Sequence, residues 1–218
     1  PMRRFAIAST HVSIAQYRQF DRELQGLKMN RMFPLKEIAP TEDCPIVYIE
    51  PRAAMRYCNW LSERDGLPQT QWCYESDEGG GERLHAAADF LTRKGYRMPT
   101  EAELELAIRG GSTSVFPWGA DLLLAHHYYA FNREGRAGIL PMQACGSLRP
   151  NAYGLFDGLG LALQICHAGD GTEAGYVWRG TAMQQMSNLL DIKQRAEKNL
   201  IHDTGVVSSF RVAKTLPR

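Results

Sequence analysis

The stretch WRGTAMQQMSNLLDIKQR, residues 178–195, carries the side chains of a contact surface rather than those of a reactive centre. It contains no Cys and no His, and its one acid, Asp191, has no second acid nearby. Covalent catalysis needs a nucleophile beside a base, and proton transfer needs a His or a tuned acid. Met183 and Met186 are thioethers, which bind soft metals only weakly, and packing is the more ordinary role of such a pair. We therefore predict that this stretch binds and does not react.

The cysteines and histidines lack the spacing of a metal site or a catalytic pair. The five cysteines are scattered and include no CxxC pair, as expected of buried, unreactive thiols in a reducing cytoplasm: Cys44, Cys58, Cys73, Cys145 and Cys166. His126 and His127 are adjacent, so on a strand they would point to opposite faces. No ligand spacing relates the other four histidines, which are His11, His85, His167 and His202. His167 and Asp170 follow Cys166 closely in sequence, which faintly suggests a catalytic Cys–His arrangement, but side chains of neighbouring residues rarely face each other. We expect no metal and no other cofactor.

Composition narrows the classes of partner. The 218 residues are 44% hydrophobic and 22% charged, with a net charge of +1, and acids and bases are interspersed. Such a chain has no basic field for nucleic acid or for an anionic membrane, and no apolar run approaches the ~18 residues of a membrane-spanning helix. Because the sequence opens on Pro1, we expect it to be a piece of a longer protein.

Three segments have helical patterns. Residues 13–24 repeat apolar side chains three or four apart, and residues 51–66 open on Pro51 and stop at Gly66. In residues 100–111, Thr100 and Glu103 form a T-x-x-E capping box, and a Gly pair ends the helix. The three glutamates of its first turns are explained by capping and by solvation, because their spacing does not place them all on one face: Glu101, Glu103 and Glu105.

The rest of the chain is irregular. Short strands are expected at residues 44–50, 175–180 and 208–214, an apolar strand at 160–165, and a short helix after the glycine run that ends at Gly81. There is no βαβ alternation and no internal repeat. The fold class predicted for residues 1–218 is therefore a single, loop-rich α+β domain.

The order of several motifs resembles one family closely. These are DCPIVYIEPRAAMRYCNWLSERDGLP, GYRMPTEAELELAIRGG, FPWG, NAYGLFDGLG, WRG and FRVAKTLP. They resemble the sulfatase-modifying-factor domain of formylglycine-generating enzymes, which implies a variant of the C-type lectin fold. Three arginines match recurring arginines of the family that are expected to be structural, paired with buried carboxylates or carbonyls: Arg179, Arg195 and Arg211. Some bacterial members are fused to kinases or other signalling modules.

The sequence departs from the family pattern at both of its metal sites. Active members carry two cysteines after an R-G-G-S segment, and these thiolates bind copper, but here Gln185 and Leu190 fall near those positions. Members usually read G-N-V-W-E-W where this chain reads Gly160-Leu161-Ala162-Leu163-Gln164-Ile165. Leu161 removes an oxygen ligand and Gln164 removes a charge, so the structural calcium of this segment is not expected.

Two functions follow from these departures. The favoured one is a non-catalytic recognition module for a protein or peptide, a degenerate bacterial member of the family. The alternative is an enzyme, either an oxygen-dependent oxidase of the formylglycine-generating type or the scaffold domain of a non-haem iron enzyme, for which resemblance alone is a weak argument.

The predicted ligand-binding surface joins the C-terminal stretch to a neighbouring loop, and no residue is assigned a catalytic role. Its residues mix apolar and hydrogen-bonding groups: Trp178, Met183, Gln184, Gln185, Asn188, Leu189, Asp191, Leu200, His202, Asp203 and Thr204. Trp178 fits equally well as an anchor of this surface or as a core residue. Residues 200–209 are all reachable from an Asn codon by changing its adenines, as in the variable proteins of diversity-generating retroelements. Ordinary drift in a surface loop explains the same residues.

Overall fold

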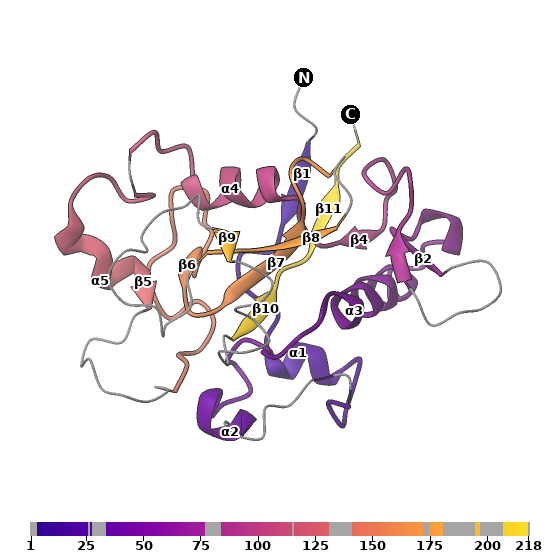
Figure 1. The fold of residues 1–218 in the computed structure, drawn as a ribbon, viewed down its shortest axis with the longest axis horizontal. Coiled ribbons are helices and arrows are strands. Elements are labelled where there is room, and N and C mark those ends of the chain that lie inside the picture. The colour runs from indigo at the N-terminus through magenta and orange to yellow at the C-terminus, as the bar shows by residue number, and fades with distance from the viewer. Residues whose placement is uncertain are drawn as a thin grey trace.

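The backbone is organised around two small sheets (Figure 1). The structure, a computed structural model, describes residues 4–25, 27, 34–76, 84–114, 116–130, 141–171, 175–180, 195–196 and 207–217. The first sheet has the order β1-β11-β4, all antiparallel, and its strands are β1 (Phe5–Ile7), β11 (Ala213–Thr215) and β4 (Tyr96–Arg97). Because β1 pairs with β11, the N-terminal and C-terminal ends lie side by side (Figure 1).

The second sheet has the order β10-β7-β8-β9. Its strands are β10 (Ser208–Phe210), β7 (Leu163–His167), β8 (Tyr176–Arg179) and β9 (Arg195–Ala196), and only β10 and β7 run parallel. Two further pairs are β2 (Tyr74–Ser76) with β3 (Leu84–Ala86) and β5 (Tyr129–Ala130) with β6 (Leu159–Gly160). All of β7 is buried, with Leu163 and Ile165 in the main core and Cys166 in a smaller one. The central strand thus has apolar packing on both faces.

Helix α3 (Pro51–Arg64) has the predicted bounds. Pro51 occupies the first helical position, where its missing N–H costs nothing, and the chain leaves the helix through Gly66 at a φ of 71°. The helix contacts β2, β3 and β4. Its buried side includes Tyr57, which stacks on Tyr17 and packs edge-on against Phe210. The helix therefore links the N-terminal segment to the C-terminal strands.

Helix α4 (Glu101–Arg109) has both predicted ends. Thr100 Oγ1 accepts from Glu103 N at 3.2 Å, and the Glu103 carboxylate accepts from Thr100 N at 2.9 Å. At the other end Gly110 is left-handed, and a Cβ there would lie 2.8 Å from Cγ of Asn151. Asn151 Nδ2 donates to the carbonyls of Ala107 and Ile108, so this close approach caps the helix.

The first predicted helix is shorter than expected. Helix α1 (Ile14–Arg18) begins at a capping box between Ser13 and Gln16, but it ends at Arg18. The following turns bring Phe20 against Tyr17 and Tyr57, which is a better burial than continuing the helix into solvent would give. The remaining helical pieces are single turns: α2 (Leu35–Ile38), α5 (Ala125–Tyr128), η1 (Gln69–Gln71) and η2 (Leu122–Leu124).

Three strand and helix predictions need correction. Residues 44–50 are largely buried but form only an isolated bridge at Pro45, because Tyr48 has a φ of 61° and breaks the extended run. The chain after the glycine run enters β3 and then turns, not a helix. Residues 208–214 are two strands, since the chain passes from one sheet to the other at Arg211. The strand at 175–180 is confirmed as β8.

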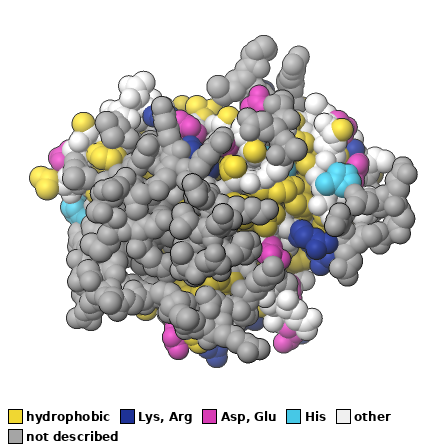
Figure 2. All heavy atoms as spheres, in the orientation of Figure 1, with side chains coloured by type: hydrophobic (Ala, Val, Ile, Leu, Met, Phe, Trp, Pro, Cys, Tyr) yellow, Lys and Arg dark blue, Asp and Glu magenta, His cyan; other side chains and the backbone are white. Residues whose placement is uncertain are grey.

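Charge is spread over the surface. On the described part of the face in Figure 2, acidic and basic side chains are interspersed, in keeping with the net charge of +1. Across the described ranges, no helix has the length and apolar character needed to cross a membrane.

Candidate functional site

All three glutamates of α4 pair with arginines, and two of them, Glu101 and Glu103, are buried, which corrects the prediction that they are solvated; Glu105 is half-buried. Glu103 meets Arg97 in a two-pronged pair, with Nη1–Oε2 at 2.6 Å and Nη2–Oε1 at 2.7 Å, and the Arg97 side chain has no exposed surface. Glu101 Oε1 lies 3.3 Å from Arg179 Nη1, and Glu105 Oε2 lies 3.1 Å from Arg179 Nη2. Helix α4 is thus joined to the strands through paired charges, the form in which buried charges are tolerated.

Arg179 fixes the strand end from which the predicted surface starts. It is the last residue of β8, is 3% exposed, and is followed by Gly180 at a φ of 89°. The chain returns to β8 at β9, where Arg195 is in register with Arg179. Residues 181–194 therefore connect two adjacent strands, and residues 197–206 connect β9 with β10 at the other edge of the same sheet.

Trp178 is a core residue. It is 6% exposed, lies in register with Ile165 and belongs to the main core. Its indole N–H is buried and has no hydrogen-bond partner within the described ranges. The other ten residues predicted to bind lie outside the residues that the structure describes: Met183, Gln184, Gln185, Asn188, Leu189, Asp191, Leu200, His202, Asp203 and Thr204.

Arg211 holds the chain crossing between the two sheets. Its side chain is fully buried, and Nε donates to Gln164 Oε1 at 2.6 Å. The two terminal nitrogens donate to four backbone carbonyls, those of Ala8, Ser9, Phe156 and Asp157. Burial lowers the pKa of Arg211 to about 10, which still leaves it charged at neutral pH. The structural role expected for Arg179 and Arg211 is confirmed; the side chain of Arg195 lies outside what is described.

Sequence similarity covers nearly the whole chain. The family model for the sulfatase-modifying factor enzyme 1-like domain, FGE-sulfatase, matches residues 1–216. The chain belongs to this family.

Curated members of the FGE-sulfatase family align with part of the chain. The formylglycine-generating enzyme of Mycobacterium tuberculosis is 29% identical over 108 residues, which are 46% of this chain and 33% of that protein. The Bos taurus enzyme is 35% identical over 88 residues, which are 35% of this chain and 23% of that protein. The matched stretch thus spans a third or less of these relatives.

Solved structures share the FGE-sulfatase fold over almost all of this chain. Treponema denticola variable protein 1 has a TM-score of 0.71 at 20% identity and covers 97% of this chain and 84% of its own. CarF has a TM-score of 0.70 at 20% identity, with 98% and 87% covered. PvdO from Pseudomonas aeruginosa has a TM-score of 0.66 at 19% identity, with 97% and 80% covered. The predicted fold, an α+β variant of the C-type lectin type, is confirmed.

The residues at the calcium segment of this FGE-sulfatase domain do not fit a cation. Leu161 is aliphatic and 1% exposed, and Gln164 is committed, since its Nε2 donates to Gly158 O at 3.0 Å and its Oε1 accepts from Arg211. Leu161 also has a φ of 61°, a left-handed conformation that the Asn of the family motif adopts more readily. Leu161 therefore adopts this conformation at a cost of about 1–2 kcal/mol. Burial of the leucine side chain offsets that cost.

The cysteines of this domain do not fit the copper site of its enzymatic relatives. No Cys occurs in residues 167–218, where the resemblance to formylglycine-generating enzymes implies a thiolate pair. Four of the five thiols are buried, and Cys145 is half-buried. Burial raises the pKa of Cys73 to about 11 and that of Cys145 to about 12, so both are protonated at neutral pH and poor ligands for a soft metal.

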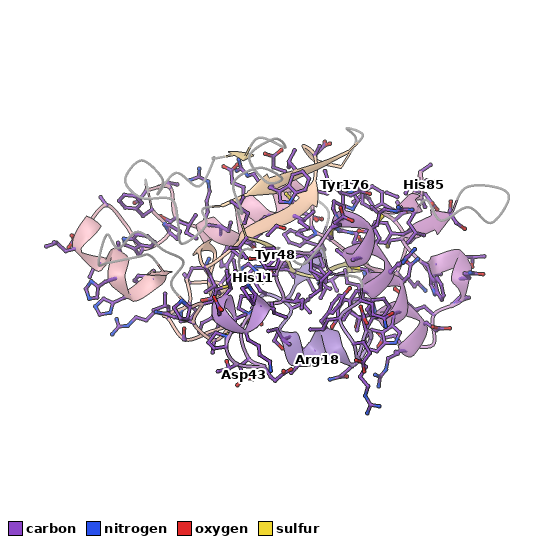
Figure 3. The ribbon with its side chains drawn as sticks, turned by 60° about the horizontal axis from the view of Figure 1, so that its bottom comes forward. His11, Arg18, Asp43, Tyr48, His85 and Tyr176 are labelled. Atoms are coloured by element: carbon purple, nitrogen blue, oxygen red, sulfur yellow. The ribbon has the colours of Figure 1, made fainter. Side chains whose placement is uncertain are left out.

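The histidines also serve the core or stand apart. His11 lies within the fold and His85 near one end of it (Figure 3), while His126 and His127 lie on α5, not on a strand, with ring centroids 3.8 Å apart. Cys166 and His167 lie on opposite faces of β7, in different surroundings. In the described part of the chain, no three His, Cys, Asp or Glu side chains come together as a metal site.

His167 sits in a cage of aromatic rings. Its centroid lies 4.5 Å from that of Phe90, 5.0 Å from Tyr176 and 5.8 Å from Tyr74. The Tyr74 hydroxyl accepts from Met98 N and forms a hydrogen bond of 3.0 Å with His167 Nε2. Burial, and then the charge of Arg97, lowers the pKa of His167 to about 3. The imidazole is therefore neutral in the folded protein.

Mild acid is expected to destabilise this domain through His167. Because the pKa of His167 is about 3 when folded and about 6.5 when unfolded, the unfolded chain binds the extra proton between these values. The free energy of unfolding should fall as the pH drops from about 6.5 towards 3, by up to about 1.4 kcal/mol per pH unit. Urea unfolding at several pH values should show a shallower slope for His167→Gln and an unchanged slope for the exposed His85→Gln. Equal slopes in all three proteins would contradict the assignment.

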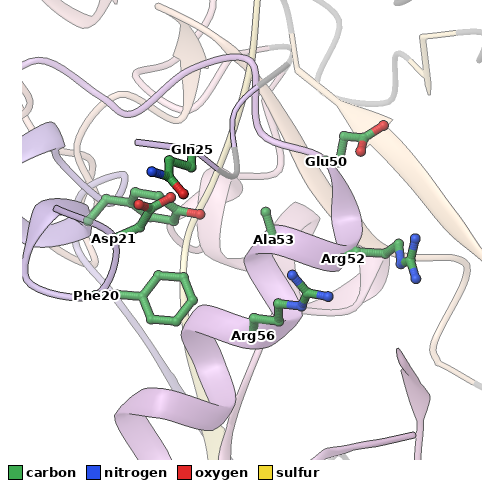
Figure 4. A pocket seen from close by; sticks show the side chains of 8 residues that line it. Phe20, Asp21, Gln25, Glu50, Arg52, Ala53 and Arg56 are labelled. Atoms are coloured by element: carbon green, nitrogen blue, oxygen red, sulfur yellow. The ribbon is translucent and has the colours of Figure 1, made fainter. Parts of the chain in front are cut away.

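A cavity between α1 and α3 was missed by the sequence reasoning. It has a volume of about 470 Å³ and lies between residues that follow α1 and the first turns of α3 (Figure 4). Its lining is Tyr17, Phe20, Asp21, Gln25, Glu50, Arg52, Ala53 and Arg56. One feature of the sequence could have indicated this cavity. Arg52 and Arg56 lie four residues apart, so they place like charges on one exposed face of α3, where opposite charges are more usual.

Proposed function

We propose that this FGE-sulfatase domain is a non-catalytic recognition module that binds a protein or peptide through residues 181–206. The observation that carries the proposal is an anchored strand end followed by a segment without cysteine. Arg179 is held by Glu101 and Glu105, as expected of the family scaffold, yet the next residues lack both thiols of the copper site. The residues that hold the fold together are present while the thiols are missing, and this combination suggests a function other than oxidation.

The sheet order supports a display role for these residues. Residues 181–194 and 197–206 each begin and end on strands of the sheet β10-β7-β8-β9. Chain segments whose two ends are fixed on a rigid sheet can vary in sequence while the scaffold stays intact. Trp178, packed in the core one residue before Arg179, would anchor the base of this surface.

The expected partner is a protein or peptide. The proposed residues include amides, two carboxylates and apolar groups, a mixture typical of protein interfaces. The net charge of +1 does not favour nucleic acid. The likeness to a protein named a variable protein supports the idea that residues 200–209 are diversified.

The binding test uses three substitutions in the proposed surface. Gln184→Ala, Gln185→Ala and Asp191→Ala together should abolish capture of a partner identified with the wild-type domain. The melting temperature should stay within about two degrees, because exposed substitutions rarely change stability by more than ~0.5 kcal/mol each. The matched control combines Gln19→Ala, Gln69→Ala and Glu63→Ala, all at exposed positions elsewhere, and should keep binding. Unfolding of the first variant would show that these side chains are core, and the proposal would be wrong.

The enzymatic alternative, supported by the curated relatives, is tested separately. Purified protein incubated with copper, reductant and a sulfatase-motif peptide should form no aldehyde, because the thiolate pair that would hold copper is missing. Mass spectrometry of the peptide measures the product, and a heat-inactivated sample is the control. Turnover above that control would favour the oxidase.

A further inference from the structure

The cavity between α1 and α3 has a pre-formed aromatic wall. The rings of Tyr17 and Tyr57 are stacked at 5.5 Å, and Phe20 packs edge-on against both, at 5.4 and 5.8 Å. Trp60 continues the cluster, 5.4 Å from Tyr57. Phe20 is the partly exposed ring of this cluster that lines the cavity. Because the other rings hold it in place, an apolar group entering the cavity would meet a ring that is already ordered.

Two opposite charges face each other across the cavity. The guanidinium of Arg56, on α3, points into the space beside Phe20 and Ala53, while the carboxylate of Asp21 lies across the cavity near Gln25 (Figure 4). Among the described residues, the side chain of Arg56 forms no ion pair and no hydrogen bond. By contrast, Arg64, two turns further along α3, lies over the Trp60 ring at 5.0 Å.

The hydroxyl of Tyr17 lies beside the cavity and is affected by both of these charges. Tyr17 has no exposed surface, and its hydroxyl has no hydrogen-bond partner among the residues described. Burial and then the Asp21 carboxylate raise the pKa of Tyr17, whereas Arg56 acts to lower it, so both charges are felt at this hydroxyl. Because this hydroxyl has no exposed surface, it is not itself a contact for a ligand.

We propose that this cavity binds a small zwitterion, a free α-amino acid with an apolar or aromatic side chain. The guanidinium of Arg56 would receive the carboxylate, Asp21 the ammonium group, and the ring of Phe20 the side chain. The lining also holds Glu50 and Arg52, so a simple anion or a simple cation meets both attractive and repulsive charges here, which disfavours both. The volume of about 470 Å³ is adequate for a ligand of this size. The site uses none of the residues of the proposed recognition surface and does not depend on that function.

The test compares matched probes by titration followed with heteronuclear NMR. L-phenylalanine should produce saturable shifts of amides in α1 and the first half of α3. Phenethylamine, which lacks the carboxylate, and 3-phenylpropionate, which lacks the ammonium group, should each bind at least about tenfold more weakly. Arg56→Gln should raise the Kd for L-phenylalanine at least about tenfold, and Arg64→Gln, on the same helix but outside the cavity, should leave it unchanged.

Each other outcome decides against the proposal. Absence of saturable shifts with both L-phenylalanine and L-leucine up to about 10 mM would overturn it, because the Kd would then lie above about 10 mM, too weak for a specific site. Equal binding of 3-phenylpropionate would overturn the zwitterion class. Equal weakening by Arg56→Gln and Arg64→Gln would show a non-specific charge effect. Asp21→Asn is a second variant, with the same expected loss, should Arg56→Gln fail to fold.

Discussion

Replacing Arg211 with alanine is expected to lower the free energy of unfolding by about 3–5 kcal/mol, a large share of the roughly 5–15 kcal/mol that is typical of a folded protein. The side chain is fully buried and its donors satisfy the Gln164 amide oxygen and four backbone carbonyls. Without it these acceptors lose their donor in a place that water reaches poorly, and a cavity opens between the two sheets.

Urea unfolding followed by circular dichroism measures this effect. Arg211→Lys should be intermediate, because an ammonium group supplies three donors in place of five. Arg18→Ala is the matched control. Its partner Glu42 lies 3.0 Å away, but the two side chains are 41% and 57% exposed, so the loss should be below about 1 kcal/mol. A loss for Arg211→Ala no larger than that of the control would refute the role assigned to this arginine.

Glu103→Ala is expected to cost about 3–5 kcal/mol for a different reason. The substitution leaves the guanidinium of Arg97 charged and buried without its carboxylate, and it also removes the reciprocal half of the capping box with Thr100. Thr100→Ala removes only the cap hydroxyl and should cost about 1 kcal/mol. The difference between the two variants, measured by urea unfolding, isolates the buried pair from the cap. Equal losses would show that Arg97 finds another partner.

Several elements could be predicted because short-range hydrogen bonds define them. The Thr100–Glu103 box joins residues three apart, and Gly110 supplies a positive φ that other residues adopt only at a cost. Pro51 and Gly66 delimit α3 in the same local way. The order of motifs then indicated the family, and the missing cysteines led to the prediction that residues 178–195 bind and do not react.

Other features could not be predicted because they depend on which distant segments meet. The spacing of Glu101, Glu103 and Glu105 says nothing of burial, and only the tertiary structure brings Arg179, 74 residues from Glu105, against the helix. Gln164 reads as a lost calcium ligand in sequence, whereas in the fold it bonds Arg211, 47 residues away.

The early end of α1 has the same cause, since Phe20 turns back to the rings of Tyr17 and Tyr57. That turn also opens the cavity in which Asp21 and Arg56 face each other (Figure 4). The sequence by itself thus determined the caps, the family and the missing thiols, because each is a matter of residue type and short spacing. The tertiary structure decided which charges are buried, which pairs form and where a cavity remains, because these follow from the packing of segments far apart in the chain.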